Sequence, residues 1–544
     1  MAEPIQVDFS GKDKSKPEAP AYIPPDRPGL KIGLALLGSV ITAFVAYYIM
    51  VPAINLKDQQ FYLYLGIVVA SFFVFLSILS GAAKDPAYMP WVRRQCTVPF
   101  ILLGVIVLFF GLNWVFSSPF FHAREYAAIM QVNRDADFKA DVEEPDINQI
   151  PKLDENAATA VANKTLGDLA DVVSQFTLSG TNTQINYKTK PVRVVTLQYQ
   201  NAIKWLFNTK DGLPGYVVVD MASEKSTFQR LPERIKYSDA EHFNELIKRH
   251  LRFQYLGWLL GEAVFEVDDS GHPYWIAPVM DMKVGLLGGQ DIVGIILCDA
   301  VTGESKDYSM EKVANDPSLQ WIDRVYSASL LQTQYDWYGK YEGGFWNSLL
   351  GQKNVTKVTA VYNYLAKDDD VFYYTGVSSV TTDESIIGFL LVNQRTKATT
   401  FYRVNGATEQ AAMNTAQGLV SDMGWTATAP LLINYGGQPT YFLSLKDAQN
   451  VVQGYSMINV TEYNKIKVNA TKVSSVVTAY SQALADNGVE LSAAEVPVTD
   501  EPGQTEPEEP AAQTDEIQVQ TAVIGGKTIQ YVVIDGETYI KVNP

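Results

Sequence analysis

Three uninterrupted apolar segments occupy the first 120 residues, and none of comparable length follows them. They cover residues 32–53, 61–82 and 98–116 and contain no Asp, Glu, Lys or Arg. Each is roughly 20 residues long, the length of helix needed to cross about 30 Å of hydrocarbon. The pattern predicts a three-helix transmembrane anchor over 32–118. The first segment is also too long for a cleaved signal peptide.

Basic residues on either side of these segments predict the orientation of the anchor. Residues 1–31 carry five of them and residues 83–97 carry Lys84, Arg93 and Arg94, whereas the first connection has only Lys57. Positive residues collect on the cytoplasmic side of a membrane. We therefore expect a multi-pass cell-membrane protein with a cytoplasmic tail, 1–31, and a large extracytoplasmic body after about residue 118.

Two stretches of the body predict the same local structure. Residues 215–231 and 388–404 align without gaps, and each has the pattern of a strand, a turn and a second strand. A helical apolar spacing follows each stretch, at 239–256 and 408–423, and each predicted helix ends at a glycine. Ser238 and Glu241 have capping-box spacing at the start of the first helix. We expect Phe243 of the first helix and Met413 of the second to be buried.

The correspondence continues beyond these helices. Residues 263–280 match 429–446 around a shared Gly-x-Pro-x-aromatic turn, and similar strands follow from 294 and from 454. Three matches in the same order predict an internal repeat, with chance similarity of β-rich segments as the alternative. The predicted fold is an α+β body with two tandem duplicated strand–strand–helix–hairpin units, 205–334 and 375–490, each an antiparallel sheet with a helix on one face.

The remaining segments complete the predicted domain organisation. Residues 119–204 read as a stalk and mixed segment with a helix near 159–176 and a strand at 192–197, and residues 335–374 form an aromatic-rich connector. Residues 491–516 are acidic, rich in proline and poor in large apolar residues, which predicts a disordered linker. Residues 517–544 alternate around two turns and predict a small three-stranded β-meander.

Charge and cysteine content narrow the class of protein. The net charge is −17, and a basic stripe that would meet nucleic-acid phosphates is missing, so we expect no nucleic-acid partner. The two cysteines are Cys96, at the cytoplasmic edge of the third apolar segment, and Cys298 in the body. A disulfide cannot form within the body, so its core must stabilise it. Cys298 follows an apolar strand and is expected to be a buried, unreactive thiol.

Candidate catalytic and metal-binding groups are few. The four histidines are His122, His242, His250 and His272, and they lack the spacing of a zinc motif. Residues 368–370 are three consecutive aspartates, which are compatible with a Ca²⁺ site or with a solvated turn before a strand. Nucleotide-binding loops and nucleophile elbows are not found in the sequence. We expect no catalytic residue, no metal and no cofactor.

The connector contains an unusual concentration of aromatic rings. Six rings fall within twelve residues, next to glycines at 339, 343 and 344. They could pack the connector against the core, contact a ligand or partner, or lie at the bilayer interface. The second alternative predicts several exposed rings. Our candidates for partner or glycan contact are Tyr335, Trp337, Tyr338, Tyr341, Phe345 and Trp346.

Several phrases of the sequence resemble a known group of proteins. Residues 183–194, 212–221, 344–353 and 387–404 are similar to an uncharacterised family of membrane-anchored extracytoplasmic proteins from Gram-positive anaerobic bacteria. The resemblance implies a bacterial envelope location and assigns no activity. The turn at 299–303 is similar to the hairpin of PepSY-type domains, which are small α+β units of bacterial surface proteins.

These observations favour a non-enzymatic function. The leading hypothesis is an anchored extracytoplasmic scaffold that binds a protein partner or assembles with itself, next to the lipid bilayer that holds it. The first alternative is a cell-envelope enzyme, or a regulator of one, acting on wall polymer or peptides. The second is a membrane subunit of a secretion or conjugation machine.

Overall fold

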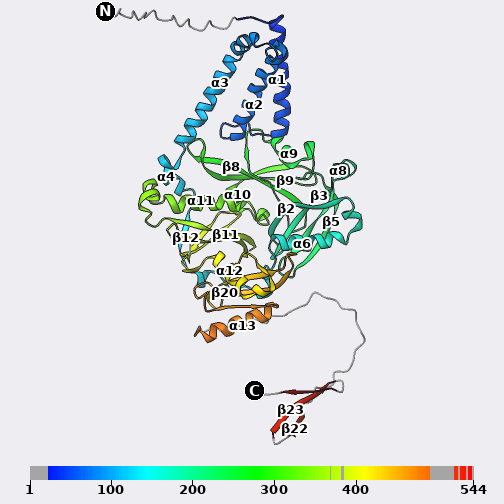
Figure 1. The fold of residues 1–544 in the computed structure, drawn as a ribbon, viewed down its shortest axis with the longest axis vertical. Coiled ribbons are helices and arrows are strands. Elements are labelled where there is room, and N and C mark those ends of the chain that lie inside the picture. Colours follow the sequence, from blue (N-terminus) through cyan, green and yellow to red (C-terminus); the bar gives the residue numbers. More distant parts are fainter. Residues whose placement is uncertain are drawn as a thin grey trace, which may run out of the picture. The chain divides into compact units, whose positions relative to one another are not determined.

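The computed structural model describes residues 22–367, 369–381 and 385–489, together with three strands between residues 520 and 541 (Figure 1). Its first three long helices are α1 (Pro28–Met50), α2 (Gln59–Ser80) and α3 (Met89–Phe116), with a 3₁₀ turn at Pro86–Tyr88 before α3. All three are long and apolar enough to cross a membrane. The prediction of three candidate spanning helices is confirmed.

The chain after α3 folds into a mixed helix and sheet body that begins with several short elements. These are α4 (Pro119–Ala127), β1 (Val132–Ala136), α5 (Phe138–Asp141), a 3₁₀ turn at Ile147–Gln149, α6 (Glu155–Gly167) and α7 (Ala170–Val173). The helix predicted near 159–176 is thus divided between α6 and α7. Asp154 caps α6 by accepting a hydrogen bond from Ala157 N–H at 2.8 Å.

The first antiparallel sheet has the strand order β2-β3-β4-β5. Its strands are β2 (Phe176–Tyr187), β3 (Lys190–Tyr199), β4 (Leu213–Asp220) and β5 (Lys225–Ile235), and helix α8 (Ala202–Asn208) connects β3 to β4. The strand predicted at 192–197 lies within β3. The predicted domain boundary at residue 204 lies between β3 and β4, which are neighbouring strands of this one sheet.

The second sheet has the order β10-β9-β8-β6, with β7 also paired to β8. Its members are β6 (Leu259–Leu260), β7 (Val264–Val267), β8 (Pro273–Val284), β9 (Gly288–Asp299) and β10 (Ser305–Ser309). A 3₁₀ turn at Phe243–Glu245 and helix α9 (Ile247–Gln254) precede it, and α10 (Met310–Asn315) and a 3₁₀ turn at Pro317–Leu319 follow. Buried residues of the first two sheets, including Val217 and Trp275, share one core.

The third sheet combines β1 with four strands that follow helix α11 (Ala328–Tyr341) and a π-helical turn at Asn347–Gly351. Its order is β1-β15-β14-β12-β11, with β1 parallel to β15 and the other pairs antiparallel. The strands are β11 (Thr356–Lys367), β12 (Asp370–Ser379), β14 (Gly388–Asn393) and β15 (Thr399–Tyr402), while β13 (Ser385–Ile386) pairs with β16 (Gly406–Ala407).

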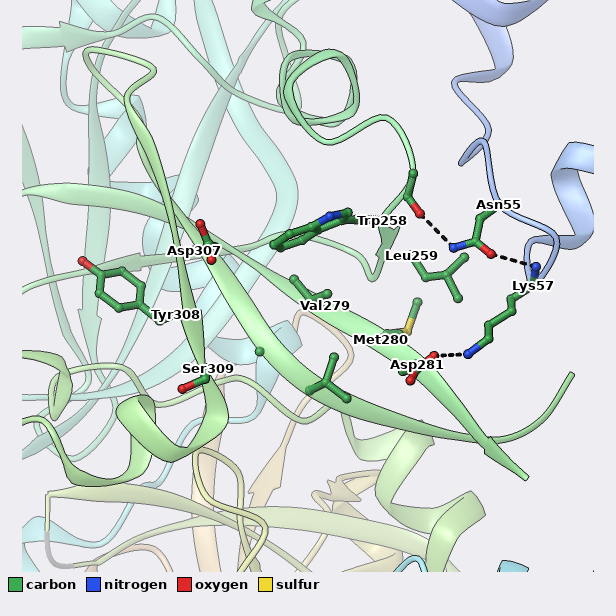
Figure 2. A pocket seen from close by; sticks show the side chains of 13 residues that line it. Asn55, Lys57, Trp258, Leu259, Val279, Met280, Asp281, Asp307, Tyr308 and Ser309 are labelled. Carbon is green, nitrogen blue, oxygen red and sulfur yellow. Dashed lines mark hydrogen bonds and ion pairs between the residues drawn. The ribbon is translucent and has the colours of Figure 1, made fainter. Parts of the chain in front are cut away.

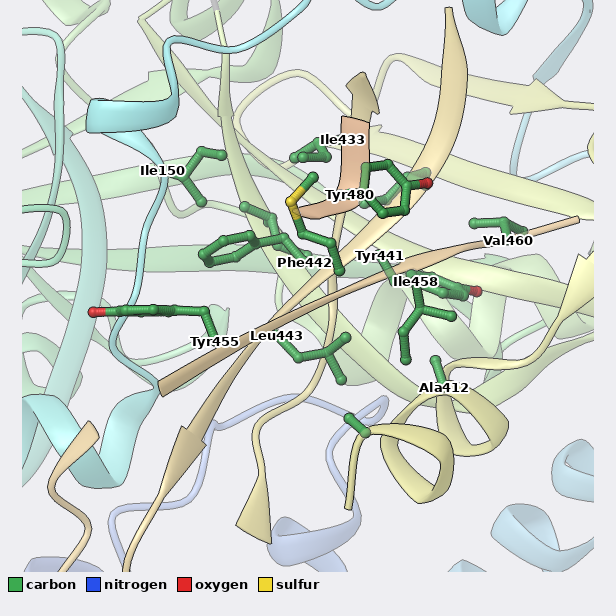
Figure 3. Packing of buried hydrophobic residues seen from close by; sticks show 14 of the residues in the cluster. Ile150, Ala412, Ile433, Tyr441, Phe442, Leu443, Tyr455, Ile458, Val460 and Tyr480 are labelled. Carbon is green, nitrogen blue, oxygen red and sulfur yellow. The ribbon is translucent and has the colours of Figure 1, made fainter. Parts of the chain in front are cut away.

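The fourth sheet has the order β17-β19-β20-β21, with β18 paired to β19. Its strands are β17 (Thr426–Ala427), β18 (Leu431–Tyr435), β19 (Gln438–Lys446), β20 (Val452–Asn459) and β21 (Lys467–Ala470). Helices α12 (Glu409–Leu419) and α13 (Val473–Asp486) cover it. Figure 3 shows Ala412 of α12 beside Ile458, and Tyr480 of α13 on the side of Ile433. Successive side chains of these strands point to opposite faces of the sheet, and one helix covers each face. The sequence predicted a helix on one face only.

The region predicted as a helix over 239–256 differs from the expectation. Only α9 and the preceding 3₁₀ turn are helical, and Phe243 is 60% exposed with a φ of 50°. The expected capping box does not form, because the Glu241 carboxylate accepts hydrogen bonds from Trp205 Nε1 at 2.8 Å and from Thr209 Oγ1 at 3.0 Å. The prediction that Phe243 is a core residue is therefore wrong.

The second predicted helix agrees better with the structure. Thr408 caps α12, and a 3₁₀ turn at Ser421–Met423 extends it to Gly424, which has a φ of 67°. Met413 is half-buried and packs against the core of the fourth sheet.

The C-terminal unit is a separate antiparallel meander, β22 (Gln520–Ile524), β23 (Lys527–Ile534) and β24 (Glu537–Lys541). It confirms the three-strand prediction. The predicted linker, 491–516, and residues 1–21 of the predicted cytoplasmic tail lie outside the described residues.

Candidate functional site

The body is fastened directly to the loop between α1 and α2. Ile54 N–H donates to the Leu256 carbonyl, and Asn55 Nδ2 donates to the Gly257 carbonyl, both at 2.8 Å. Lys57 Nζ forms an ion pair with Asp281 at 2.5 Å. Three different contacts from one short loop fix the second sheet against the ends of α1 and α2.

Two further attachments hold the same face of the body. Arg249 Nε donates to the Tyr48 carbonyl at 2.9 Å, and Arg252 Nε donates to the Val51 carbonyl at 3.1 Å, so α9 holds the end of α1. At the end of α3, Ser117 Oγ accepts from the Leu286 and Leu287 N–H groups at 3.1 Å. Helices α1–α3 and the body therefore meet through specific polar contacts rather than through a free stalk.

A pocket of about 410 Å³ lies where the α1–α2 loop meets the second sheet (Figure 2). Val279, Met280 and Val293 form its apolar floor, and Trp258 covers one side. Figure 2 shows Lys57 directed toward Asp281 at one end, with Asp307, Tyr308 and Ser309 at the other. Burial opposes ionisation of Asp281, but hydrogen bonds from Lys57 and Met282 N–H outweigh it and hold the pKa of Asp281 below its ordinary value.

A larger groove, of about 990 Å³, runs between β2, the β8–β9 hairpin and the start of α11. Pro278, Met280, Met282, Ile292 and Trp337 supply its apolar surface. Hydroxyl and amide side chains supply most of its polar lining: Ser179, Thr181, Asn182, Thr183, Gln198, Gln290, Ser327, Ser329 and Thr333. Its charged lining residues are Asp239, Glu262 and Arg324. The size and the mixture of surfaces fit a binding site for an extended polar chain.

A β-bulge shapes one rim of this groove. The pairing of β2 with β3 shifts register between Leu178 and Asn182, which leaves the intervening residues outside the regular ladder. Ser179 Oγ and Thr181 Oγ1 both donate to the Asp239 carboxylate. Asn182 Oδ1 accepts from Arg193 at 3.1 Å. The polar groups of the rim are thus held in place before any ligand arrives.

Two fully buried carboxylates lie behind the groove. Glu266 accepts hydrogen bonds from the Asp323 N–H at 2.9 Å and the Arg324 N–H at 2.7 Å, and Asp323 accepts from the Asn186 N–H at 2.6 Å. Burial raises the pKa of Glu266 to about 7. Burial and the neighbouring Glu266 charge raise the pKa of Asp323 well above its ordinary value. Together they brace the loop that carries Arg324 to the groove.

The six candidate aromatic residues lie on a helix and the turn after it, not in an open connector loop. Ser327 caps α11 at Leu330 N–H, and residues spaced by four, Leu331, Tyr335 and Gly339, form its buried face. Burial raises the pKa of Tyr335. Trp337, Tyr338, Tyr341 and Phe345 are half-buried, and Trp346 is 61% exposed.

The structure divides these six residues between different environments. Tyr335 belongs to the core, and Trp337 lines the groove with its ring 4.9 Å from that of Tyr126. Arg134 lies over the Tyr338 ring at 5.0 Å. Phe345 and Trp346 contact Phe120 at 5.2 and 6.1 Å, next to the end of α3. The rings do not converge on one ligand site.

The other candidate groups also have structural surroundings. Asp370 is buried in an ion pair with Arg395, and within the described ranges no group of three His, Cys, Asp or Glu side chains is placed to hold a metal ion. His242 lies outside α9, so the two histidines predicted on one helix are on separate elements. Cys298 is fully buried, and burial raises the pKa of its thiol to about 12.

Sequence reasoning missed the groove residues and the buried Glu266–Asp323 pair. Serine, threonine and single acidic residues near turns look like ordinary surface positions in a sequence. The sequence contained one signal of the groove. A helix whose buried face carries Leu331 and Tyr335 has a polar face with Ser327, Ser329 and Thr333. Comparison of the chain with models of protein families, with curated proteins and with solved structures found no match.

Proposed function

We propose that the protein is a membrane-anchored extracytoplasmic scaffold that holds an extended segment of a protein partner in the groove between β2, β8–β9 and α11. The observation that carries this proposal is the groove itself. Its volume, its hydroxyl and amide lining and its two methionines suit a peptide backbone with alternating side chains. The polar attachments of the body to the anchor support it, because they would hold the groove at a constant distance from the membrane.

The methionines favour a protein partner over a rigid small ligand. Met280 and Met282 line the groove next to Trp337. Unbranched methionine side chains adapt to differently shaped apolar partners. Asp239 and Glu262 give the groove two carboxylates and Arg324 one cation, so a segment with a basic residue fits its charge.

The proposal includes an internal duplication of the body. The first and third sheets both contain two successive antiparallel hairpins, β2–β5 and β11–β15, and a helix and a second antiparallel sheet follow each. In both first hairpins the register shifts after three paired residues, between Leu178 and Asn182 and between Val358 and Tyr362. Shared bulge positions are expected of two copies of one unit, because bulges are retained within families. A duplicated body would offer two related surfaces for assembly.

The proposed orientation places the body outside the cell, in a bacterial envelope. We expect a membrane-impermeant maleimide to label Ser475→Cys in intact cells, and to label Ala87→Cys only after lysis, because the charge asymmetry puts residues 83–97 inside. Both positions are exposed, and the native Cys96 and Cys298 are buried and should react slowly. If intact cells label Ala87→Cys but not Ser475→Cys, the orientation is the opposite of the one proposed.

The groove can be tested with one matched pair of substitutions. Ser329 lines the groove on α11 and is exposed, so Ser329→Arg should obstruct it without disturbing the core. We expect this variant of the full chain, purified from native membranes, to retain at least tenfold less co-purifying partner than wild type. Ser475→Arg makes the same change on α13 and should retain the partner. Equal retention by both variants contradicts a role for the groove.

The second candidate function is a cell-envelope enzyme that acts on wall polymer. Asp239 and Glu262 both line the groove, and pairs of carboxylates hydrolyse glycosidic bonds in many enzymes. Asp239, however, is held by two hydroxyl groups of the bulge, which favours a structural role. Release of soluble fragments from peptidoglycan by the full chain, abolished by Glu262→Gln, would favour the enzyme.

A further inference from the structure

Two exposed apolar surfaces lie at the ends of the anchor helices and have no role in the groove. The first, which we name the α8 rim, consists of Ile203, Leu206, Phe207 and Phe243. Their exposed fractions are 66%, 65%, 79% and 60%. The second, the π-turn rim, consists of Phe120, Phe121, Trp346, Leu349 and Leu350, which are 50–75% exposed.

The α8 rim is continuous with the end of α1. An apolar hollow of about 620 Å³ is lined by Tyr48 and Ile49 of α1 together with Ile203, Leu206 and Phe243 of the rim. Tyr48 Oη donates to Asn244 Oδ1 at 3.2 Å, and Arg249 lies 4.1 Å from the Tyr48 ring. The exposed apolar side chains of α8 therefore begin where the lipid-facing surface of α1 ends.

The π-turn rim is continuous with the end of α3 through a series of ring contacts. Phe116, the last residue of α3, lies 5.6 Å from Phe121, and Phe121 lies 4.8 Å from Phe120. Phe120 in turn contacts Phe345 at 5.2 Å and Trp346 at 6.1 Å. Leu349 and Leu350 extend this surface along the π-helical turn.

The lengths of the spans place both rims at the level of the lipid headgroups. Helix α1 has 23 residues, which at 1.5 Å each span about 34 Å, so Tyr48 lies near the edge of a 30 Å hydrocarbon layer. The apolar part of α3, residues 98–116, is also about long enough to cross the hydrocarbon layer, so Phe116 lies near its edge. Figure 1 shows α4 and α8 on opposite sides of the body, both at the end where the spans enter it.

Each rim has basic residues beside it. Residues 202–210 contain Lys204 and Lys210, and residues 343–366 contain Lys353 and Lys357, whereas Phe243 of the α8 rim lies between Glu241 and Glu245. Basic residues beside exposed aromatic and aliphatic side chains are typical of segments that bind the interface of an anionic bilayer.

We propose that both rims insert into the interfacial layer of the membrane, on the side that carries the body, and that the bilayer is their partner. Continuity with the spans favours the lipid surface over a second copy of the chain. Insertion at two places on opposite sides of the body would fix its tilt and the direction in which the groove opens. The inference assigns Phe345 and Trp346 to the bilayer interface rather than to a glycan.

Depth-dependent quenching in vesicles tests the proposal. The full chain is reconstituted in phosphatidylcholine vesicles with 30% phosphatidylglycerol, with an environment-sensitive fluorophore on Phe207→Cys or Leu350→Cys. We expect a nitroxide at the lipid headgroup to quench both probes at least twofold more than a probe on Ser475→Cys, which is exposed on α13. A probe on Leu102→Cys, exposed on α3, should instead be quenched most by a nitroxide deep in the acyl chains.

Three outcomes overturn the proposal, and they are distinguishable. If the Leu102 probe is quenched but the rim probes behave as the Ser475 probe does, the spans are inserted and the rims are not. If the Leu102 probe is also unaffected, both the rim insertion and the membrane anchoring in the proposed function fail. If the rim cysteines cross-link between copies and escape lipid quenching, self-assembly covers the rims.

Discussion

Replacing Asp370 with Asn is expected to lower the free energy of unfolding by about 3–5 kcal/mol, because it leaves the Arg395 guanidinium buried without its counterion. The two side chains form a bidentate ion pair, with Arg395 Nε 2.7 Å from Oδ1 and Nη2 2.8 Å from Oδ2 of Asp370. Each side chain is only 10% exposed. A charge held in such a site cannot recover the lost partner by hydration.

The position of this pair explains why its loss should affect the whole body. Asn393 Nδ2 also donates to Asp370, at 2.8 Å, and Arg395 Nη1 reaches the Val313 carbonyl at 3.3 Å. The pair therefore connects β12 and the β14–β15 turn of the third sheet to α10, which follows the second sheet. Its disruption would loosen the junction between the two halves of the body.

Denaturant titration of the full chain in detergent, followed by tryptophan fluorescence, measures the effect. The matched control is Asp171→Asn, which removes a carboxylate that pairs with Arg230 at the surface, where both side chains are more than half exposed. We expect the control to leave the free energy of unfolding nearly unchanged, because water solvates the remaining charge. A loss below about 1 kcal/mol for Asp370→Asn would show that the junction relaxes and hydrates Arg395.

Local pattern predicted the parts of this fold whose causes are local. The three long helices α1–α3 were predictable because some twenty consecutive residues without charge have few alternatives. Hairpins such as β14–β15 were predictable because two short runs rich in apolar and β-branched residues are separated by turn residues. The C-terminal meander followed from the same reasoning.

Contacts between distant residues account for what the pattern missed. The predicted start of a helix at Ser238 failed because Glu241 is bound by Trp205 and Thr209, thirty or more residues earlier. The loop between α1 and α2 is fastened to the body through Lys57 and Asp281, which are 224 residues apart. The helix of the aromatic segment follows the spacing of Leu331, Tyr335 and Gly339, whereas the sequence interpretation treated the six neighbouring rings as part of a connector loop.

The candidate groove was the least predictable feature, because its lining is assembled from many separate segments between Gln59 and Trp337. Its polar lining consists of residues that also occur at ordinary surface turns, such as Ser179 and Ser327. The acidic residues behind it, Glu266 and Asp323, are 57 positions apart and meet only when β7 packs beside the loop before α11. Spacing rules cannot detect such a pair.

The Glu266–Asp323 pair should make the body less stable as pH rises from 5 to 8. Both carboxylates are fully buried, and Glu266 has a pKa of about 7, against an ordinary value of 4.5. Below pH 4.5 Glu266 is neutral in the folded and unfolded states alike. As pH rises toward 7, the unfolded chain ionises freely, whereas the folded chain must keep the proton or bury a charge, so stability falls.

The expected size of this effect is roughly 3 kcal/mol from Glu266 between pH 4.5 and pH 8, because one pKa unit corresponds to about 1.36 kcal/mol. Asp323 adds to it in the same direction, since burial and the Glu266 charge raise its pKa also. Carboxylates with lowered pKa values, such as Asp281 and Asp299, have the opposite sign, but their stabilisation is lost only as pH falls through the acid range. Glu241, Asp336 and Glu409 also have raised pKa values and the same sign, so the contribution of Glu266 is the part of the decline between pH 5 and pH 8 that its substitution removes.

Denaturant titrations of Glu266→Gln and Glu262→Gln across this range test the assignment. Glu266→Gln removes the ionisation and should flatten the decline, although the variant loses one acceptor for the Asp323 and Arg324 N–H groups and should be less stable at pH 5. Glu262 is four residues away and exposed, so Glu262→Gln should keep the wild-type decline. An unchanged slope in Glu266→Gln would assign the pH dependence to other groups, and the buried pair would then have to remain ionised through its hydrogen bonds to the backbone.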